Sequence, residues 1–237
     1  MIEEKVIGFI CKKSNYQDYD AIINLLTSQG KITFKAKGIL KNNSKNAASC
    51  NYFMIGEYVY YSKAENSNKT LKTAHCLKIY KKPYEDLCVN ASYLLICQLL
   101  DYFSLEINGY DMAIKCFDYL ENGEYPLTVL NFFLKNLCCA LGYSPDLSGC
   151  IHCHQKTKLI SFDFEMGGFI CKDCFKEKMN QKISSDILKD IYLLLNTDEF
   201  QRLKEESSLY IYKLYVDFFK NYLNLPFHNL NFVLECI

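Results

Sequence analysis

Four cysteines in two closely spaced pairs constrain this chain more than any other feature. Cys150 and Cys153 form one Cys-x-x-Cys pair, and Cys171 and Cys174 form the second after 17 intervening residues. This spacing is typical of tetrahedral zinc sites with four thiolate ligands. The segment 159–170 alternates toward a Gly-Gly pair and then returns, which predicts a hairpin that brings the two pairs together.

The expected metal is one structural zinc ion. Four cysteines fill a tetrahedral shell, whereas a catalytic zinc keeps an open position for water, so Glu165 nearby has little to activate. His152 and His154 flank the first pair and could replace a ligand, but a complete four-cysteine set favours them as solvent-facing or outer groups. A redox role would need one reactive pair on a βαβ frame, which the surrounding sequence lacks.

Charge divides the chain into two parts. Residues 1–82 contain 14 lysines against 6 acidic residues, and residues 83–237 contain 13 basic against 21 acidic residues, so the net charges are +8 and −8. Such a shift predicts a domain boundary near residue 82. A basic first domain indicates a polyanionic partner, and the acidic domain is expected to have another task.

The first domain is predicted to be rich in β-strands. β-branched and aromatic segments alternate with turn-rich stretches there, and the run 19–26 suits either a strand or a short helix. Four or five short strands in about 80 residues suit a small barrel or a sandwich; among small barrels, the OB-fold has an oligonucleotide-binding face. The expected strands are 4–12, 31–38, 51–61 and 69–80.

Lysines gather on one face of the expected strand 31–38 and in the loop after it. Strict alternation places its lysines opposite Ile32, Phe34 and Ala36, so one face is core and the other is cationic. A phosphate track and a device against edge pairing are both open interpretations. The candidate nucleic-acid-binding residues are Lys31, Lys35, Lys37, Lys41 and Lys45.

Two further features bear on nucleic-acid recognition. Arg202 is the only arginine, and because lysine acts as a point charge, the composition favours phosphate contacts over base-specific reading; an AT-rich genome would produce the same bias. Tyr58 and Tyr60 are candidate base-stacking platforms. Strand alternation alone leaves them equally suited to the barrel core.

Residues 83–237 are predicted to be helical, with one insertion at about 148–176. The most apolar stretch, 125–143, is interrupted by Asn131, Lys135 and Asn136, which favours a buried helix over a membrane span. No secretory signal is evident, so a cytoplasmic location is expected, with most other cysteines as core residues. The expected helices are 84–103, 111–120, 126–142, 187–194 and 209–223.

Common catalytic signatures are absent from the sequence. It has no phosphate-binding P-loop, no dinucleotide-binding glycine motif, no His-Glu-x-x-His and no Gly-x-Ser-x-Gly. These absences favour a binding protein over an enzyme.

The chain resembles the RecO family of bacterial recombination and repair mediators, in its zinc-binding branch. The resemblance runs nearly end to end. It is carried by the strand 30–38 with its basic loop, by the Leu-Gly-Tyr-Ser-Pro-Asp-Leu approach at 141–147, and by the Gly-Gly-Phe-Ile-Cys run at 167–171.

That resemblance implies an α+β multidomain protein: an N-terminal OB-fold β-barrel at 1–82, then an α-helical domain at 83–237 with an inserted four-cysteine zinc-binding loop. It also implies binding of single- and double-stranded DNA, annealing of complementary strands, and loading of the RecA recombinase with RecR and single-stranded-DNA-binding protein. The alternatives are a zinc-containing nucleic-acid-modifying enzyme and a protein–protein adaptor without direct DNA binding.

Overall fold

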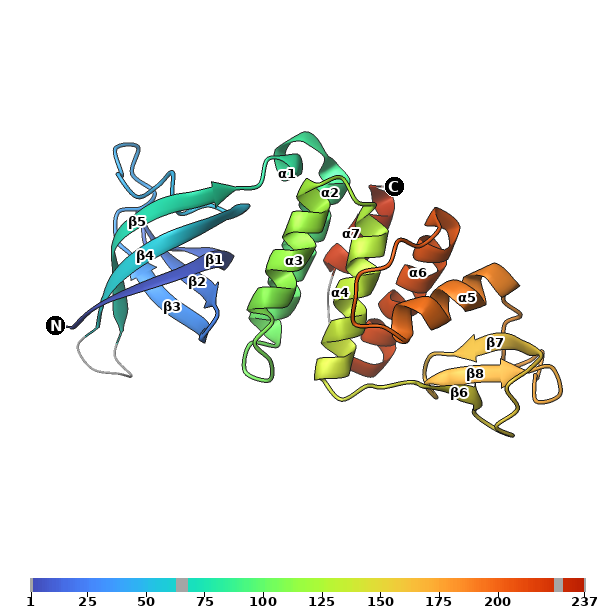
Figure 1. Ribbon diagram of the computed structural model, residues 1–237. Helices are drawn as coiled ribbons and strands as arrows, with labels where there is room; N and C mark the ends of the chain where they lie inside the picture. The colour runs from blue at the N-terminus through green and yellow to red at the C-terminus, as the bar shows by residue number, and fades with distance from the viewer. Residues whose placement is uncertain (1, 63–67, 224–227, 237) are drawn as a thin grey trace. The chain divides into compact units, whose positions relative to one another are not determined.

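The protein is described by a computed structural model that covers residues 2–62, 68–223 and 228–236. The chain divides into two compact units, Met1–Asn122 and Gly123–Ile237. Among the described residues, the first unit holds five strands and three helices, and the second holds three strands and four helices (Figure 1).

The five strands of the first unit form a closed barrel in the order β1-β2-β3-β5-β4, with β4 pairing back onto β1. Neighbouring strands are antiparallel except β3 and β5, which run parallel. This OB-like arrangement confirms the predicted fold class and decides between barrel and sandwich. The strands are β1 (Ile2–Tyr16), β2 (Asp20–Thr27), β3 (Gly30–Ala36), β4 (Met54–Ser62) and β5 (Lys69–Ile79).

Aromatic side chains fill the barrel interior. Every second residue of β4 is buried, and Tyr58 and Tyr60 are only 0% and 2% exposed. The Tyr58 hydroxyl donates to the backbone oxygen of Ser49 at 3.2 Å, and the Tyr60 hydroxyl donates to Glu4 Oε2 at 2.8 Å. Both rings are therefore core residues, and neither offers a face on which a base could stack.

Three helices complete the first unit: α1 (Lys82–Glu85), α2 (Leu87–Tyr102) and α3 (Tyr110–Glu121). The single helix expected at 84–103 is interrupted at Asp86, whose backbone is extended and whose side chain accepts the Val89 N–H at 3.0 Å. Asp86 thus ends α1 and caps α2. Phe9 of β1 packs edge-on against Phe117 of α3, with ring centroids 5.1 Å apart.

The helices of the first unit bring acidic groups to the lysines of the barrel. Asp101 at the end of α2 pairs with Lys31 at 3.2 Å, and Asp118 of α3 pairs with Lys78. The unit that ends at Asn122 contains 15 lysines against 13 acidic residues, a net charge of +2. Much of the charge difference across residue 82 therefore lies within the first unit, between the lysines of the barrel and the acidic residues of the helices packed on it. The domain limits 1–82 and 83–237 stay a prediction.

The second unit combines helices with a small three-stranded sheet. In that sheet β8 is central, antiparallel to β7 and parallel to β6. The hairpin of β7 and β8 was expected, whereas β6 and α7 were not. The elements are α4 (Pro126–Ala140), β6 (Asp146–Cys150), β7 (Leu159–Asp163), β8 (Gly168–Cys171), α5 (Ser185–Leu195), α6 (Glu205–Leu223) and α7 (His228–Glu235).

Helix α4 is buried, as its apolar composition predicts. Two of its buried polar residues bond to neighbouring segments: Lys135, 4% exposed, donates to the Thr197 carbonyl at 2.9 Å and to Asp198 Oδ1 at 2.7 Å. Asn131 Nδ2 donates to the Ser208 carbonyl at 2.8 Å. Within the described part of the chain, no helix has the length and apolar character needed to cross a bilayer.

The hydrogen bonds between the Glu4 carboxylate and β4 predict that the free energy of unfolding decreases in acid. Hydrogen bonds from Tyr60 at 2.8 Å and from Ser62 at 2.9 Å hold the pKa of Glu4 below its ordinary value of 4.5. The stability contributed by the carboxylate is therefore complete above its unfolded-state pKa and is lost as pH falls through the lower folded-state pKa.

We expect urea unfolding, followed by circular dichroism from about pH 5 to about pH 3, to show a larger decrease in the free energy of unfolding for the native chain than for Glu4→Gln. Parallel pH profiles for the two proteins would contradict this role for Glu4.

Candidate metal centre and nucleic-acid interface

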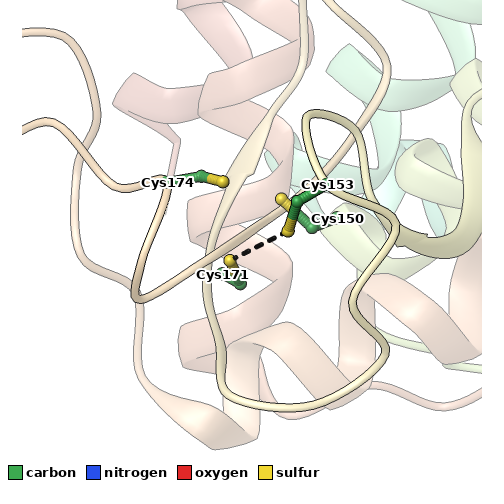
Figure 2. A group of neighbouring side chains, drawn as sticks. All are labelled: Cys150, Cys153, Cys171 and Cys174. Atoms are coloured by element: carbon green, nitrogen blue, oxygen red, sulfur yellow. Dashed lines mark hydrogen bonds between the residues drawn. The ribbon is translucent and has the colours of Figure 1, made fainter.

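The small sheet of the second unit brings the four predicted cysteines together. Cys150 ends β6 and Cys171 ends β8, while Cys153 and Cys174 lie in the turns that follow. Figure 2 shows the four thiols facing one another. Their Sγ atoms all lie within 4.8 Å of one another, and those of Cys153 and Cys171 are 3.5 Å apart.

Local sequence fixes this geometry through tight turns. His154 N–H donates to the Cys150 carbonyl at 2.8 Å, and Cys174 N–H donates to the Cys171 carbonyl at 3.2 Å, so each pair closes a short turn. Gly167 has a φ of +70°, a conformation that suits glycine. At Gly168 a Cβ would stand 2.2 Å from a methyl group of Ile151, so only glycine allows β6 and β8 to approach this closely.

The arrangement fits a tetrahedral metal ion. Sulfur atoms bound to one ion at about 2.3 Å lie roughly 3.8 Å from one another, and the four Sγ atoms here are all within 4.8 Å of one another, close enough to share one ion. His152, His154 and Glu165 are exposed, and none belongs to the metal-competent group found among the described residues. The four cysteines can therefore hold a metal ion by themselves.

Electrostatics around the thiols favours thiolate at one position. Burial opposes the ionisation of Cys150, but backbone N–H groups of Cys171, His152 and Cys153 stabilise the thiolate and lower its pKa to about 6. The Cys174 thiol donates a hydrogen bond to Cys153, and this bond raises the pKa of Cys174 to about 12. A metal ion would replace the protons that the thiols otherwise share.

Aromatic packing attaches this hairpin to the helices of its own unit. Phe164, just beyond β7, packs edge-on against Tyr215 of α6 with centroids 4.8 Å apart, and it stacks on Tyr143 at 5.4 Å. The Tyr143 hydroxyl also donates to the Phe164 carbonyl. A metal ion that fixes the hairpin would therefore also fix the position of Phe164 against α6.

The five candidate lysines lie on β3 and the loop after it, but they differ in their surroundings. Lys31 donates to the backbone oxygen of Asp101 at 3.1 Å besides pairing with its carboxylate. Lys35 pairs with Asp20 at 2.8 Å and donates to Gln17 at 3.2 Å. The three exposed members of the set are Lys37, Lys41 and Lys45.

Sequence reasoning missed two exposed tyrosines at this end of the barrel. Tyr16 ends β1 and Tyr19 precedes β2, and their side chains are 44% and 54% exposed. The Lys35 ammonium lies 4.5 Å from the centroid of the Tyr16 ring, and that of Lys41 lies 5.4 Å from the centroid of the Tyr19 ring. The turn-forming run Asn-Tyr-Gln-Asp-Tyr-Asp at 15–20 was an available signal.

The fold and the site define a two-part protein: an OB-like barrel with helices, and a helical unit whose small sheet carries four cysteines able to hold a metal ion. Family models for the N-terminal and C-terminal regions of Recombination protein O match residues 1–80 and 85–231. The chain therefore belongs to the RecO family of DNA repair proteins.

Individual relatives support the same assignment. A DNA repair protein RecO of Lactobacillus helveticus is 27% identical over 76% of this chain and 73% of its own length. One from Listeria monocytogenes is 22% identical over 98% of this chain and 94% of its own length. One from Bacillus pumilus is 26% identical over 72% of this chain and 68% of its own length.

The metal centre predicts a clear difference between two cysteine variants. In Cys171→Ser a poor hydroxyl ligand replaces one of the four thiols, so we expect bound metal to fall from about one ion per chain to near zero. Cys139→Ser, which changes an exposed thiol outside the group, should keep its metal. Mass spectrometry of metal content in the purified proteins makes the comparison.

Hydrogen exchange should report the structural consequence. Residues 146–174 are expected to lose amide protection in Cys171→Ser and to retain it in Cys139→Ser. Full protection in a metal-free Cys171→Ser protein would contradict a bracing role for the metal.

Proposed function

We propose that the protein is a non-enzymatic DNA repair and recombination mediator. It binds single- and double-stranded DNA without strong sequence preference, anneals complementary strands, and helps RecR and single-stranded-DNA-binding protein to load the RecA recombinase in the cytoplasm. The observation that carries the proposal is the gathering of lysines on β3 and its following loop, on a barrel of OB-like architecture in a RecO-family chain.

Phosphate neutralisation would supply the chemistry of annealing. Two complementary strands repel each other through their phosphates, and lysine ammonium groups lower that repulsion while they displace condensed counterions. Once the repulsion is lowered, base pairing drives the strands together without a nucleotide fuel. A lysine-rich surface suits this task because it binds backbone rather than base sequence.

The exposed lysines would carry most of this binding. Lys37, Lys41 and Lys45 present their ammonium groups to solvent. By contrast, Lys31 and Lys35 already have carboxylate partners in Asp101 and Asp20, so a phosphate must compete for them. We therefore assign Lys31 and Lys35 a smaller share of the affinity, although all five belong to the proposed interface.

The metal would be a single structural zinc ion held by all four cysteines. Zinc suits a four-thiolate tetrahedron, and a shell closed by protein ligands has no position for a reacting water. The ion would then brace the hairpin at the end of β6 and β8 and take no part in chemistry. This role agrees with the proposed absence of enzymatic activity.

Salt dependence tests the assignment of the lysines. Each phosphate contact to a single strand contributes about 0.7 to the slope of log affinity against log salt, so Lys37→Ala with Lys41→Ala should lower that slope by about 1.4 and weaken binding. Fluorescence anisotropy with a labelled oligonucleotide at several salt concentrations measures both quantities. A matched control removes two exposed helical lysines, Lys115 and Lys213, and should leave the slope unchanged.

Equal slopes for the two double variants would place the DNA-binding surface elsewhere. A smaller decrease is expected for Lys31→Ala alone, because the ammonium group of Lys31 is held by Asp101.

Strand annealing tests the function itself. Metal-replete protein, without nucleotide, should accelerate the pairing of two labelled complementary oligonucleotides, and the Lys37→Ala, Lys41→Ala variant should do so more slowly. Failure to bind or anneal DNA at low salt would instead indicate an adaptor, and covalent change of the oligonucleotides would indicate an enzyme.

A further inference from the structure

A hollow of about 420 Å³ lies between the β1–β2 turn and the loop that follows β3. It is open to solvent at the end of the barrel where the exposed lysines gather. Its lining residues are Gln17, Asp18, Tyr19, Asp20, Lys37, Gly38 and Lys41. The hollow therefore combines one aromatic ring with charged groups of both signs.

The hollow has a fixed shape. Gly38 N–H donates to Asp20 Oδ1 at 2.7 Å, and Leu40 N–H donates to the Tyr19 carbonyl at 3.0 Å, so two segments distant in sequence are joined at this point. Gln17 adopts a φ of +59° and Gly38 a φ of +63°, which gives both segments tight bends. A site that is already ordered loses little conformational entropy when a ligand binds.

An aromatic ring lines this hollow beside a cation. The Tyr19 side chain is 54% exposed, unlike Tyr58 and Tyr60 in the barrel core, and the Lys41 ammonium lies 5.4 Å from the centroid of its ring. A partly solvated tyrosine ring is a platform on which a nucleobase can stack, whatever its sequence.

Acidic and basic side chains both line the hollow, Asp18 and Asp20 beside Lys37 and Lys41. Asp20 is paired with Lys35 at 2.8 Å, whereas Asp18 is exposed and can present its carboxylate to a bound group. Carboxylates accept hydrogen bonds from the amino and imino groups of bases. Lys37 and Lys41, both exposed, are the cations available to the phosphates on either side of a bound nucleotide.

We propose that this hollow binds one nucleobase of a single DNA strand, stacked on Tyr19, with Lys37 and Lys41 contacting the flanking phosphates. The inference rests on the proposed DNA-binding function and extends it by naming a base-binding site. A base within a duplex is already stacked and paired, so the site selects single strands. Tyr19 therefore gives the site a preference for single-stranded over double-stranded DNA, which lysines alone do not provide.

The test compares Tyr19→Ala with Tyr19→Phe on three labelled probes: a single-stranded oligonucleotide, an abasic strand of the same length, and a duplex. Loss of one stacked base should weaken single-strand binding by Tyr19→Ala about 5- to 150-fold. Binding of the abasic strand and of the duplex should be unchanged, and the salt slope should stay the same. Tyr19→Phe keeps the ring and should bind all three probes like the native protein.

Tyr84→Ala is the matched control, because Tyr84 is an exposed tyrosine on α1, outside the residues that line the hollow. It should bind all probes normally. Thermal melting by circular dichroism checks that each variant is folded.

The outcomes distinguish this inference from the function on which it rests. If the native protein binds the single strand and Tyr19→Ala binds it equally well, the base site is overturned and DNA binding stands. If Tyr19→Ala weakens all three probes alike, the residue supports the surface generally and the base site is again overturned. Native protein that binds no single strand at low salt overturns both.

Discussion

The carboxylate of Asp101 joins helix α2 of the first unit to three strands of the barrel. It accepts hydrogen bonds from Lys31 at 3.2 Å and Asn24 at 2.7 Å, and Lys12 lies 3.6 Å away, so it links β1, β2 and β3 to the end of α2. Its side chain is only 15% exposed, which strengthens these interactions relative to those in water. Asp101 thus engages Lys31, whereas Lys37, Lys41 and Lys45 in the loop after β3 are exposed.

The sequence was most informative where the signal is local. Cysteine spacing, strand alternation and helical periodicity depend on residues a few positions apart, and the hairpin of β7 and β8, the barrel strands and α4 followed from them. The strand β6 was missed because Asp-Leu-Ser-Gly-Cys has no β-branched residue, and its place is set by the close approach that Gly168 allows.

Other features depend on partners far away in sequence and could not be predicted. Alternation correctly placed Lys31 and Lys35 opposite Phe34, but it carries no information about Asp101, which lies 70 residues from Lys31. Tyr58 and Tyr60 could not be assigned from alternation either, because both faces of a strand can carry tyrosine. Only the closure of β4 onto β1 shows that this face points inward.

The seam between barrel and helices also determines how the protein can be divided. Phe9 is fully buried, with its ring against Tyr110 and Phe117 of α3, and Lys31 and Lys78 have their counter-ions on α2 and α3. A fragment cut after residue 82 would keep a charge of +8 and uncover that aromatic surface. A fragment that ends at Asn122 keeps both the aromatic contacts of Phe9 and the acidic partners of the two lysines, so the chain must be cut some forty residues beyond the last barrel strand to keep the first unit intact.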